Sequence, residues 1–160
     1  AQCDGCPAAL GFEAPLFIPV RREALLITNA RKGEGARPWS ASAGANAMAI
    51  GIAIAVHTLA GLRERLPDYS VTLDPLGFTS KAHTMLVFEA FVSGASKGTS
   101  HHDDAAIAAR AFASGIGEFE MMNAIDEREI LSLSGAALIH TRWLEPSMEA
   151  LTSPCLVVKP

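Results

Sequence analysis

Residues 43–66 form the stretch that most constrains how this chain folds. Between residues 43 and 62 the polar side chains are few, namely Asn46, His57 and Thr58. Larger apolar residues recur at three- and four-residue steps, which places them on one helical face: Met48, Ile52, Val56, Leu59, Leu62 and Leu66. A helix that is apolar nearly all round is usually buried on more than one side. We therefore expect a long helix inside the core, stopped by Pro67.

A second stripe of this helix consists of very small residues, namely Gly44, Ala47, Gly51 and Ala55. Such a stripe lets another backbone approach closely, although a mid-helix glycine costs about 1 kcal/mol of helix propensity. The alternative is a membrane span, which needs about 20 apolar residues. Because the stretch is mostly alanine and glycine, contains His57 and lacks an aromatic belt, we favour a core or interface helix and expect no membrane partner.

The composition limits the number of domains, the oligomeric state, the partners and the location of the protein. A chain of 160 residues fits a single globular domain spanning 1–160, with residues 1–15 as a candidate extended segment. Hydrophobic residues make up 49% and charged residues 19%, so few charges cover the surface and a homo-oligomer is expected. The net charge of −4, without a basic tract, argues against a nucleic-acid partner. Because 3 cysteines do not make a disulfide framework, the cytoplasm is the expected location.

The pattern of the chain predicts alternating strands and helices. Short apolar or alternating runs indicate strands at residues 16–20, 24–28, 69–74, 84–92, 135–141 and 155–158. Besides the long helix, we expect a helix at residues 105–123, kinked near Gly115 and Gly117, and a short one at 126–133. The expected fold class is α/β (or α+β), with a mixed sheet built from two βαβ-like units.

Two loops rich in glycine and lysine, residues 30–42 and 93–104, each connect an expected strand to an expected helix. Ligands of α/β sheets gather at such loops, and helix N-termini favour anions. If the loops face each other, four cations surround one carboxylate- or phosphate-bearing molecule: Arg31, Lys32, Arg37 and Lys97. Thr99 and Ser100 would add hydroxyl donors. The plainer interpretation is a pair of solvated surface loops.

The second loop also contains the letters GASKG at residues 94–98, which match the G-x-S-x-G pattern of a nucleophile elbow. In this hypothesis Ser96 is the nucleophile or a donor, and its proton-transfer partners are His140 or His102, with Asp126. The alternative is a glycine-rich turn capped by Ser100, because the expected helix begins several residues after the serine. Both loops together predict a small-molecule enzyme of hydrolase or acyl-transfer type.

Two other functions stay open. The first is a non-catalytic ligand-binding or structural subunit of a homo-oligomer, with the small-residue stripe as its interface. The second is a thiol redox or zinc protein that uses the C-x-x-C pair Cys3 and Cys6. His101 and His102 are weaker metal candidates, because neighbouring helical residues point about 100° apart; a polar helix start is the alternative for them. We expect no resident metal, and no cofactor is predicted.

Overall fold

The computed structural model describes residues 5–35, 38–92 and 96–160. Its helices and strands follow one another along the chain as β1 (Ala8–Phe12), β2 (Phe17–Pro19), the 3₁₀ helix η1 (Ala24–Leu26), α1 (Ser42–Arg65), β3 (Ser70–Thr72), β4 (Thr84–Ala90), α2 (His101–Ser114), α3 (Phe119–Met122), β5 (Ile130–Ser132), α4 (Leu133–His140), α5 (Met148–Thr152) and β6 (Val157–Val158). The mixture of helices with a parallel sheet confirms the α/β class.

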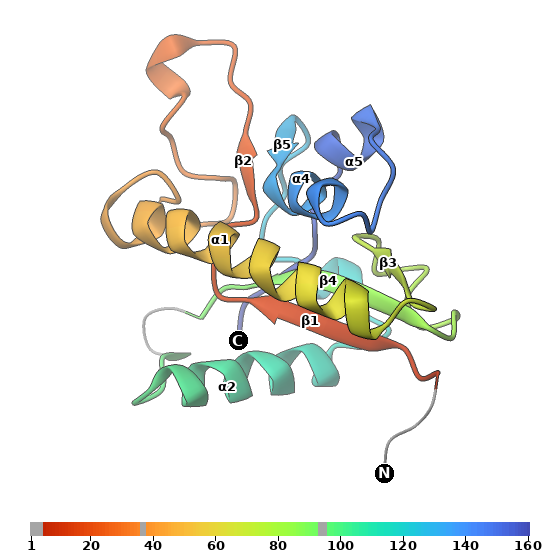
Figure 1. The fold of residues 1–160 in the computed structure, drawn as a ribbon. Coiled ribbons are helices and arrows are strands. Elements are labelled where there is room, and N and C mark those ends of the chain that lie inside the picture. The colour runs from red at the N-terminus through yellow and green to blue at the C-terminus, as the bar shows by residue number, and fades with distance from the viewer. Residues whose placement is uncertain (1–4, 36–37, 93–95) are drawn as a thin grey trace.

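The main sheet is parallel and is built around β4 (Figure 1). β1 pairs with one edge of β4, whereas β3 and β6 pair with successive parts of the other edge. All 7 residues of β4 are buried, because helices cover both faces of the sheet. Met85 and Val87 pack toward the side of α1 and α4, and Leu86 and Phe88 pack toward α2 and α3.

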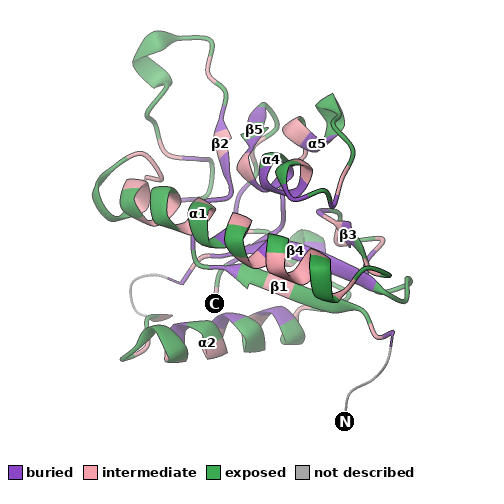
Figure 2. Ribbon diagram, viewed as in Figure 1, coloured by how far each residue is buried: buried purple, intermediate pink, exposed green. Residues whose placement is uncertain are grey.

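The long helix is confirmed as α1, and its larger apolar residues do face the core. Leu59 is buried, with Ile52, Val56, Leu62 and Leu66 packed against the same core cluster. The prediction of burial on more than one side is wrong, since Ala55 and Leu59 are the buried residues of α1. His57, expected in the core or an interface, is exposed. The opposite face of α1 thus stands open to solvent (Figure 2).

The small-residue stripe does allow a close approach, as predicted. A Cβ added to Gly51 would lie 2.1 Å from the Cβ of Ala14, and one added to Gly44 would lie 2.5 Å from the carbonyl oxygen of Pro38. Ala55, on the same stripe, is fully packed. The stripe therefore lets α1 pack closely on the segment that follows β1.

Three local assignments are wrong. Residues 24–28 contain η1 instead of a strand, because the chain there closes turns onto itself, with Leu26 N donating to Glu23 O. Residues 126–133, expected as a helix, contain β5. Residues 135–141, expected as a strand, lie almost wholly in α4, which Ser132 caps by accepting a hydrogen bond from Gly135 N. Short apolar runs fit a buried strand and a buried helix equally well.

The helix expected at residues 105–123 starts earlier and breaks instead of kinking. Ser100 caps α2, so that the helix begins at His101. It ends at Ser114, and α3 follows after Gly117, which has a φ of 97°. The strands expected at 16–20, 69–74, 84–92 and 155–158 are confirmed in shorter form as β2, β3, β4 and β6. The two-unit layout is not confirmed, because β2 pairs with β5 in a separate small sheet.

Residues 20–30 form an arm that projects from the body of the molecule between β2 and the chain leading to α1 (Figure 1). Its stem is tied to neighbouring segments on both sides. Arg21 donates to both carboxylate oxygens of Glu127, at 2.6 and 2.9 Å, and Val20 N donates to Glu129 O. On the segment that leads from the arm back to the body, Asn29 O accepts a hydrogen bond from the indole of Trp39.

The contact between Arg21 and Glu127 predicts that the contribution of Glu127 to stability depends on pH. Partial burial raises the pKa of Glu127, but hydrogen bonds from Arg21 and Lys32 N outweigh burial and hold it below its ordinary value. A carboxylate with a lowered folded-state pKa stabilises above its unfolded pKa of about 4.3 and loses this contribution as pH falls through the folded value. Glu127→Gln should therefore cost about 1 kcal/mol of unfolding free energy at pH 7 and progressively less on acidification.

Urea denaturation of both proteins at a series of pH values measures this difference. The matched control is Glu129→Gln, because Glu129 makes a longer contact of 3.5 Å with Arg22 and both side chains are largely exposed. This control should leave stability nearly unchanged. An equal cost for the two variants, or a pH-independent cost for Glu127→Gln, would contradict the assigned role of the Arg21 contact.

Candidate functional site

The candidate site lies at the carboxyl-terminal edge of the parallel sheet. β1 and β4 run in the same direction, so the segments that follow Phe12 and Ala90 meet at this edge. The N-terminal ends of α1 and α2 reach the same edge from opposite faces of the sheet (Figure 1). Open α/β sheets bind their ligands at this edge, because strand ends and helix N-termini converge there.

One cavity at this edge, with a volume of about 160 Å³, lies between the start of α1 and loop 93–104. The first turn of α1, which follows loop 30–42, contributes Ala43 and Gly44, and loop 93–104 contributes Lys97. The remaining walls come from the ends of β1 and β4, including Glu13 and Phe91. Lys97 is the one cation among the described residues that line it.

α1 begins beside this cavity and has no side-chain cap. Its N-cap residue is Ala41, which offers no side-chain acceptor, and its first turn contains no acidic residue. Ser40 does not cap the helix, because its hydroxyl donates to Thr28 O at 2.5 Å. Helix N-terminal amides and the helix dipole favour an anion. Lys97 and the start of α1 therefore give one side of the cavity an anion-attracting character.

A second cavity of about 200 Å³ lies on the other side of Glu13, beneath α2. Its walls are mostly apolar and include Phe88 and Phe112, whose rings stack with centroids 4.7 Å apart. Glu13 and Asp104 supply its carboxylates. His101, at the first position of α2, places Nδ1 3.7 Å from Oε2 of Glu13. Glu13 thus borders both cavities and lies beside an imidazole.

Asp104 and Asp103 fix the start of α2. Asp104 is 1% exposed and accepts a hydrogen bond of 2.6 Å from Gly98 N. Asp103 accepts hydrogen bonds from the hydroxyls of Thr99 and Ser100, at 2.6 and 2.9 Å, and these bonds lower the pKa of Asp103. The hydroxyls of Thr99 and Ser100, predicted as ligand donors, therefore bind Asp103, and Ser100 also caps α2.

The four predicted cations are not gathered around one ligand. Arg31 is fully buried and forms bidentate contacts with Glu89, at 2.6 and 2.7 Å, and with Glu34, at 2.9 and 3.1 Å. Hydrogen bonds and charge from the two glutamates outweigh desolvation and raise the pKa of Arg31. Lys32 pairs with Asp126 at the surface, and Arg37 lies outside the described residues. Of the three cations that the structure describes, Lys97 alone borders the cavity.

The proposed nucleophile and its proposed partners are not hydrogen-bonded to one another in the described part of the chain. The hydroxyl of Ser96 donates to Pro160 O at 3.0 Å, and Asp126 is engaged by Lys32. His140 is exposed at the end of α4, and His102 is exposed in the first turn of α2. Within the described part of the chain, no hydrogen bond joins any two of these four residues. Gly94, on which the elbow pattern also depends, lies outside that part.

The cysteines provide no exposed thiol where the structure describes them. Cys6 is disulfide-bonded, so a zinc site that used its thiolate would first need this bond reduced. Cys3 lies outside the described residues. Cys155 is a free cysteine, but burial raises the pKa of its thiol strongly, which makes it unreactive as a nucleophile.

Glu13, His101 and Asp104 are the described side chains that are best placed to hold a metal ion. One ligand atom from each lies within 4.8 Å of the others. Ligand atoms on a single ion at about 2.1 Å are roughly 3.0 to 3.4 Å apart, so these side chains would have to draw together. Sequence reasoning missed Glu13 as a site residue, because it did not predict β1, the strand that ends directly before Glu13.

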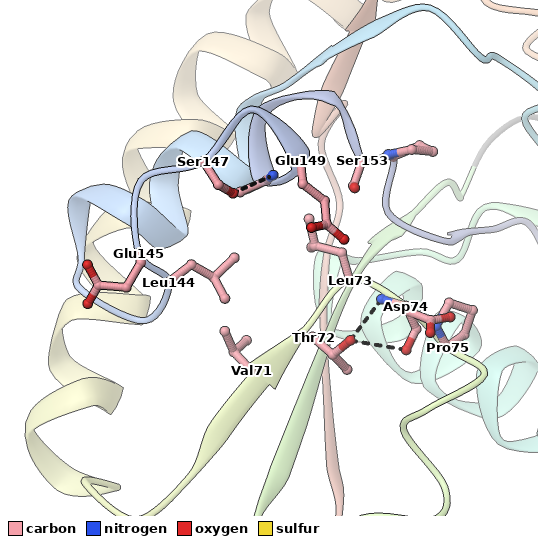
Figure 3. Close-up of a pocket in the computed structure, with 12 residues that line it drawn as sticks. Val71, Thr72, Leu73, Asp74, Pro75, Leu144, Glu145, Ser147, Glu149 and Ser153 are labelled. Carbon is pink, nitrogen blue, oxygen red and sulfur yellow. Dashed lines mark hydrogen bonds between the residues drawn. The ribbon is translucent and has the colours of Figure 1, made fainter.

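A larger cavity, of about 470 Å³, lies elsewhere, between the end of β3 and α5. Figure 3 shows Thr72 and Asp74 across this cavity from Ser147 and Glu149. The hydroxyls complete local turns, since Asp74 N donates to Thr72 and Ala150 N donates to Ser147. Its charged lining residues are all acidic, namely Asp74, Glu145 and Glu149. Its lining therefore offers no partner for an anion, and no predicted site residue borders it.

Comparison with known proteins found no family model, no curated protein and no solved structure that matches this chain.

Proposed function

We propose that this protein is a small-molecule enzyme that acts on a carboxylate- or phosphate-bearing substrate at the carboxyl-terminal edge of its sheet. The observation that carries the proposal is that Lys97 and Glu13 border one cavity at the uncapped N-terminus of α1. A cation and a carboxylate in the same cavity bind an anionic group and at the same time place a proton acceptor beside the rest of the ligand.

Each residue has a distinct role in this proposal. Lys97 and the first-turn amides of α1 hold the anionic group. The remainder of the substrate then extends past Glu13 toward the apolar cavity beneath α2. Glu13 orients the imidazole of His101, which takes a proton from a water molecule that attacks the substrate. Catalytic hydrogen bonds are often long without substrate, so a separation of 3.7 Å suits a dyad that tightens on binding.

The cavity volumes limit the substrate. The two cavities, of about 160 and 200 Å³, are both below the range of about 300 to 1,000 Å³ that is typical of drug-sized ligands. A short ester that also carries a free carboxylate, or a small phosphate ester, fits this space, whereas a nucleotide does not. The reaction class that follows is hydrolysis or acyl transfer.

A thermal-shift panel tests the binding step. Inorganic phosphate, short carboxylates, phosphate esters and nucleotides are compared at fixed ionic strength on the wild type and on Lys97→Ala. A ligand at about 100 times its dissociation constant stabilises the folded state by about 2.7 kcal/mol, which is a shift of a few degrees. Lys97→Ala should abolish the shift. Lys81→Ala is the matched control, because Lys81 is also exposed but precedes β4 at the other end of the sheet.

Turnover tests the catalytic step separately. Esters that keep the bound anionic group free should be hydrolysed by the wild type and by His102→Ala, but not by His101→Ala, which should still bind them. Equal turnover in the two histidine variants would remove His101 from the mechanism. No thermal shift with any anion would remove the anion site itself.

The non-catalytic subunit of a homo-oligomer is the second candidate function. The exposed apolar face of α1 favours it. Ligand-induced stabilisation that depends on Lys97, without turnover of any ester, would support this candidate over the enzyme.

A further inference from the structure

The tip of the arm is apolar and exposed. Leu25 has 92% of its surface exposed, and Leu26 and Ile27 beside it are also exposed. The tip is nevertheless held in place, because Arg21 binds Glu127 on one side of the stem and Ser40 binds Thr28 O on the other. An apolar tip that is exposed and held by its stem is preorganised for binding a partner.

The outer face of α1 is a second apolar surface without a partner. Its exposed residues recur at three- and four-residue steps: Asn46, Ala49, Ile50, Ala53, Ile54, His57 and Ala60. Ile50 and Ile54 are 62% and 53% exposed. No Asp, Glu, Lys or Arg occurs in α1 before Arg63. Figure 2 shows both the arm tip and the outer face of α1 as exposed.

We propose that these two surfaces bind each other between two copies of this chain. In the resulting twofold dimer, the arm tip of each copy packs on the outer face of α1 of the other copy. Leu25 and Ile27 would lie over Ala49 and Ala53, where small side chains leave room beside Ile50 and Ile54. This inference does not depend on the proposed enzymatic function.

The lack of charges on the two surfaces points to a second copy as the occupant, because one chain carries both surfaces. Neither the tip, residues 24–28, nor the α1 face, residues 43–60, carries an acidic or basic side chain other than His57, so twofold pairing juxtaposes no like charges. The α1 face is about 27 Å long and about 10 Å wide. Its area is therefore roughly a third of the 800 Å² that each partner buries in a standard interface. Twofold symmetry adds the arm contacts from both copies, because each copy both donates and receives an arm.

Sedimentation velocity over a dilution series tests the dimer. The wild type should dimerise, and Leu25→Asp and Ile54→Lys should each raise the dimer dissociation constant at least about tenfold, because each places a charge in an apolar contact. Leu76→Asp is the matched control, since Leu76 is 69% exposed but lies on the turn after β3. It should leave the dissociation constant unchanged. All three replaced residues are exposed, so circular dichroism should show folded proteins.

A cross-link tests the pairing of the tip with α1. Leu25→Cys protein mixed with Ile54→Cys protein should form a cross-linked heterodimer with a short bismaleimide, whereas Leu76→Cys protein mixed with Ile54→Cys should not. A wild type that is monomeric at every concentration would overturn the proposal. So would a dimer that tolerates both Leu25→Asp and Ile54→Lys, or a loss caused by only one of them. α1 is long and apolar enough to cross a membrane, so a monomer that binds phosphatidylcholine vesicles through Ile50 and Ile54 would identify a lipid surface instead.

Discussion

Replacement of Arg31 by methionine is expected to reduce the free energy of unfolding by about 3–5 kcal/mol. Arg31 lies between Glu89 and Glu34, and all three side chains are at most 1% exposed. Without the guanidinium, two carboxylates remain buried without a counter-charge. Glu89 keeps a hydrogen bond of 3.0 Å from Leu16 N, which is too little to replace two charge-assisted contacts.

The pH dependence of the variant follows from the same geometry. Burial raises the pKa of Glu89, and Arg31 is the main group that opposes this rise. In Arg31→Met the folded protein will bind a proton at Glu89 more tightly than the unfolded chain does, so its stability should fall as pH rises through the folded-state pKa. The deficit relative to the wild type should therefore shrink on acidification.

Urea denaturation from pH 4 upward measures the deficit, with Arg22→Met as the matched control. Arg22 is 88% exposed and its pairing with Glu129 is loose, so this control should cost less than about 0.5 kcal/mol. Adding Glu89→Gln to Arg31→Met should recover part of the loss, because the amide carries no charge into the core. A cost for Arg31→Met as small as that of the control would show that the buried ion pairs do not hold β4 to loop 30–42.

The Arg31 cluster shows why the predicted site could be located only in part from the sequence. Residues Arg31 and Glu89 are 58 positions apart, and no local pattern marks them as a pair. A cation in a glycine-rich loop was therefore predicted to bind a ligand, although the folded chain supplies its partners. Lys97 has the same local setting, but it reaches a cavity. Long-range ion pairing decides between the two outcomes.

Long periodic segments were predictable, whereas short ones were not. The spacing from Met48 to Leu66 specified α1, and the largely apolar run at 84–92 specified β4, because each pattern fits one secondary structure over many residues. The exposed face of α1 could not be predicted, since the sequence does not distinguish an exposed alanine or isoleucine from a buried one. Residues 130–140 were assigned in reverse order, because the cap formed by Ser132 and the packing of Gly135 were not visible as local signals.

Gly135→Ala is expected to destabilise the protein by about 3 kcal/mol, although alanine is the better helix former. Gly135 lies in α4, and an added Cβ would stand 1.8 Å from the carbonyl oxygen and 2.7 Å from the carbonyl carbon of Ala150 in α5. These are backbone atoms, so relief requires moving α5 away from α4. Such a shift would open the contact between the two helices and the core around Leu138.

The same substitution at Gly61 provides a control with the opposite expected sign. Gly61 also lies in a helix, α1, but an added Cβ there would meet no atom within 4 Å. Gly61→Ala should therefore stabilise the protein by about 0.5–1 kcal/mol, since the methyl group costs no packing and restricts the unfolded chain. Denaturant midpoints of the two variants compare the effects directly. If both variants gained stability, α5 would not pack against Gly135, and the arrangement of α4 and α5 over the sheet would have to be revised.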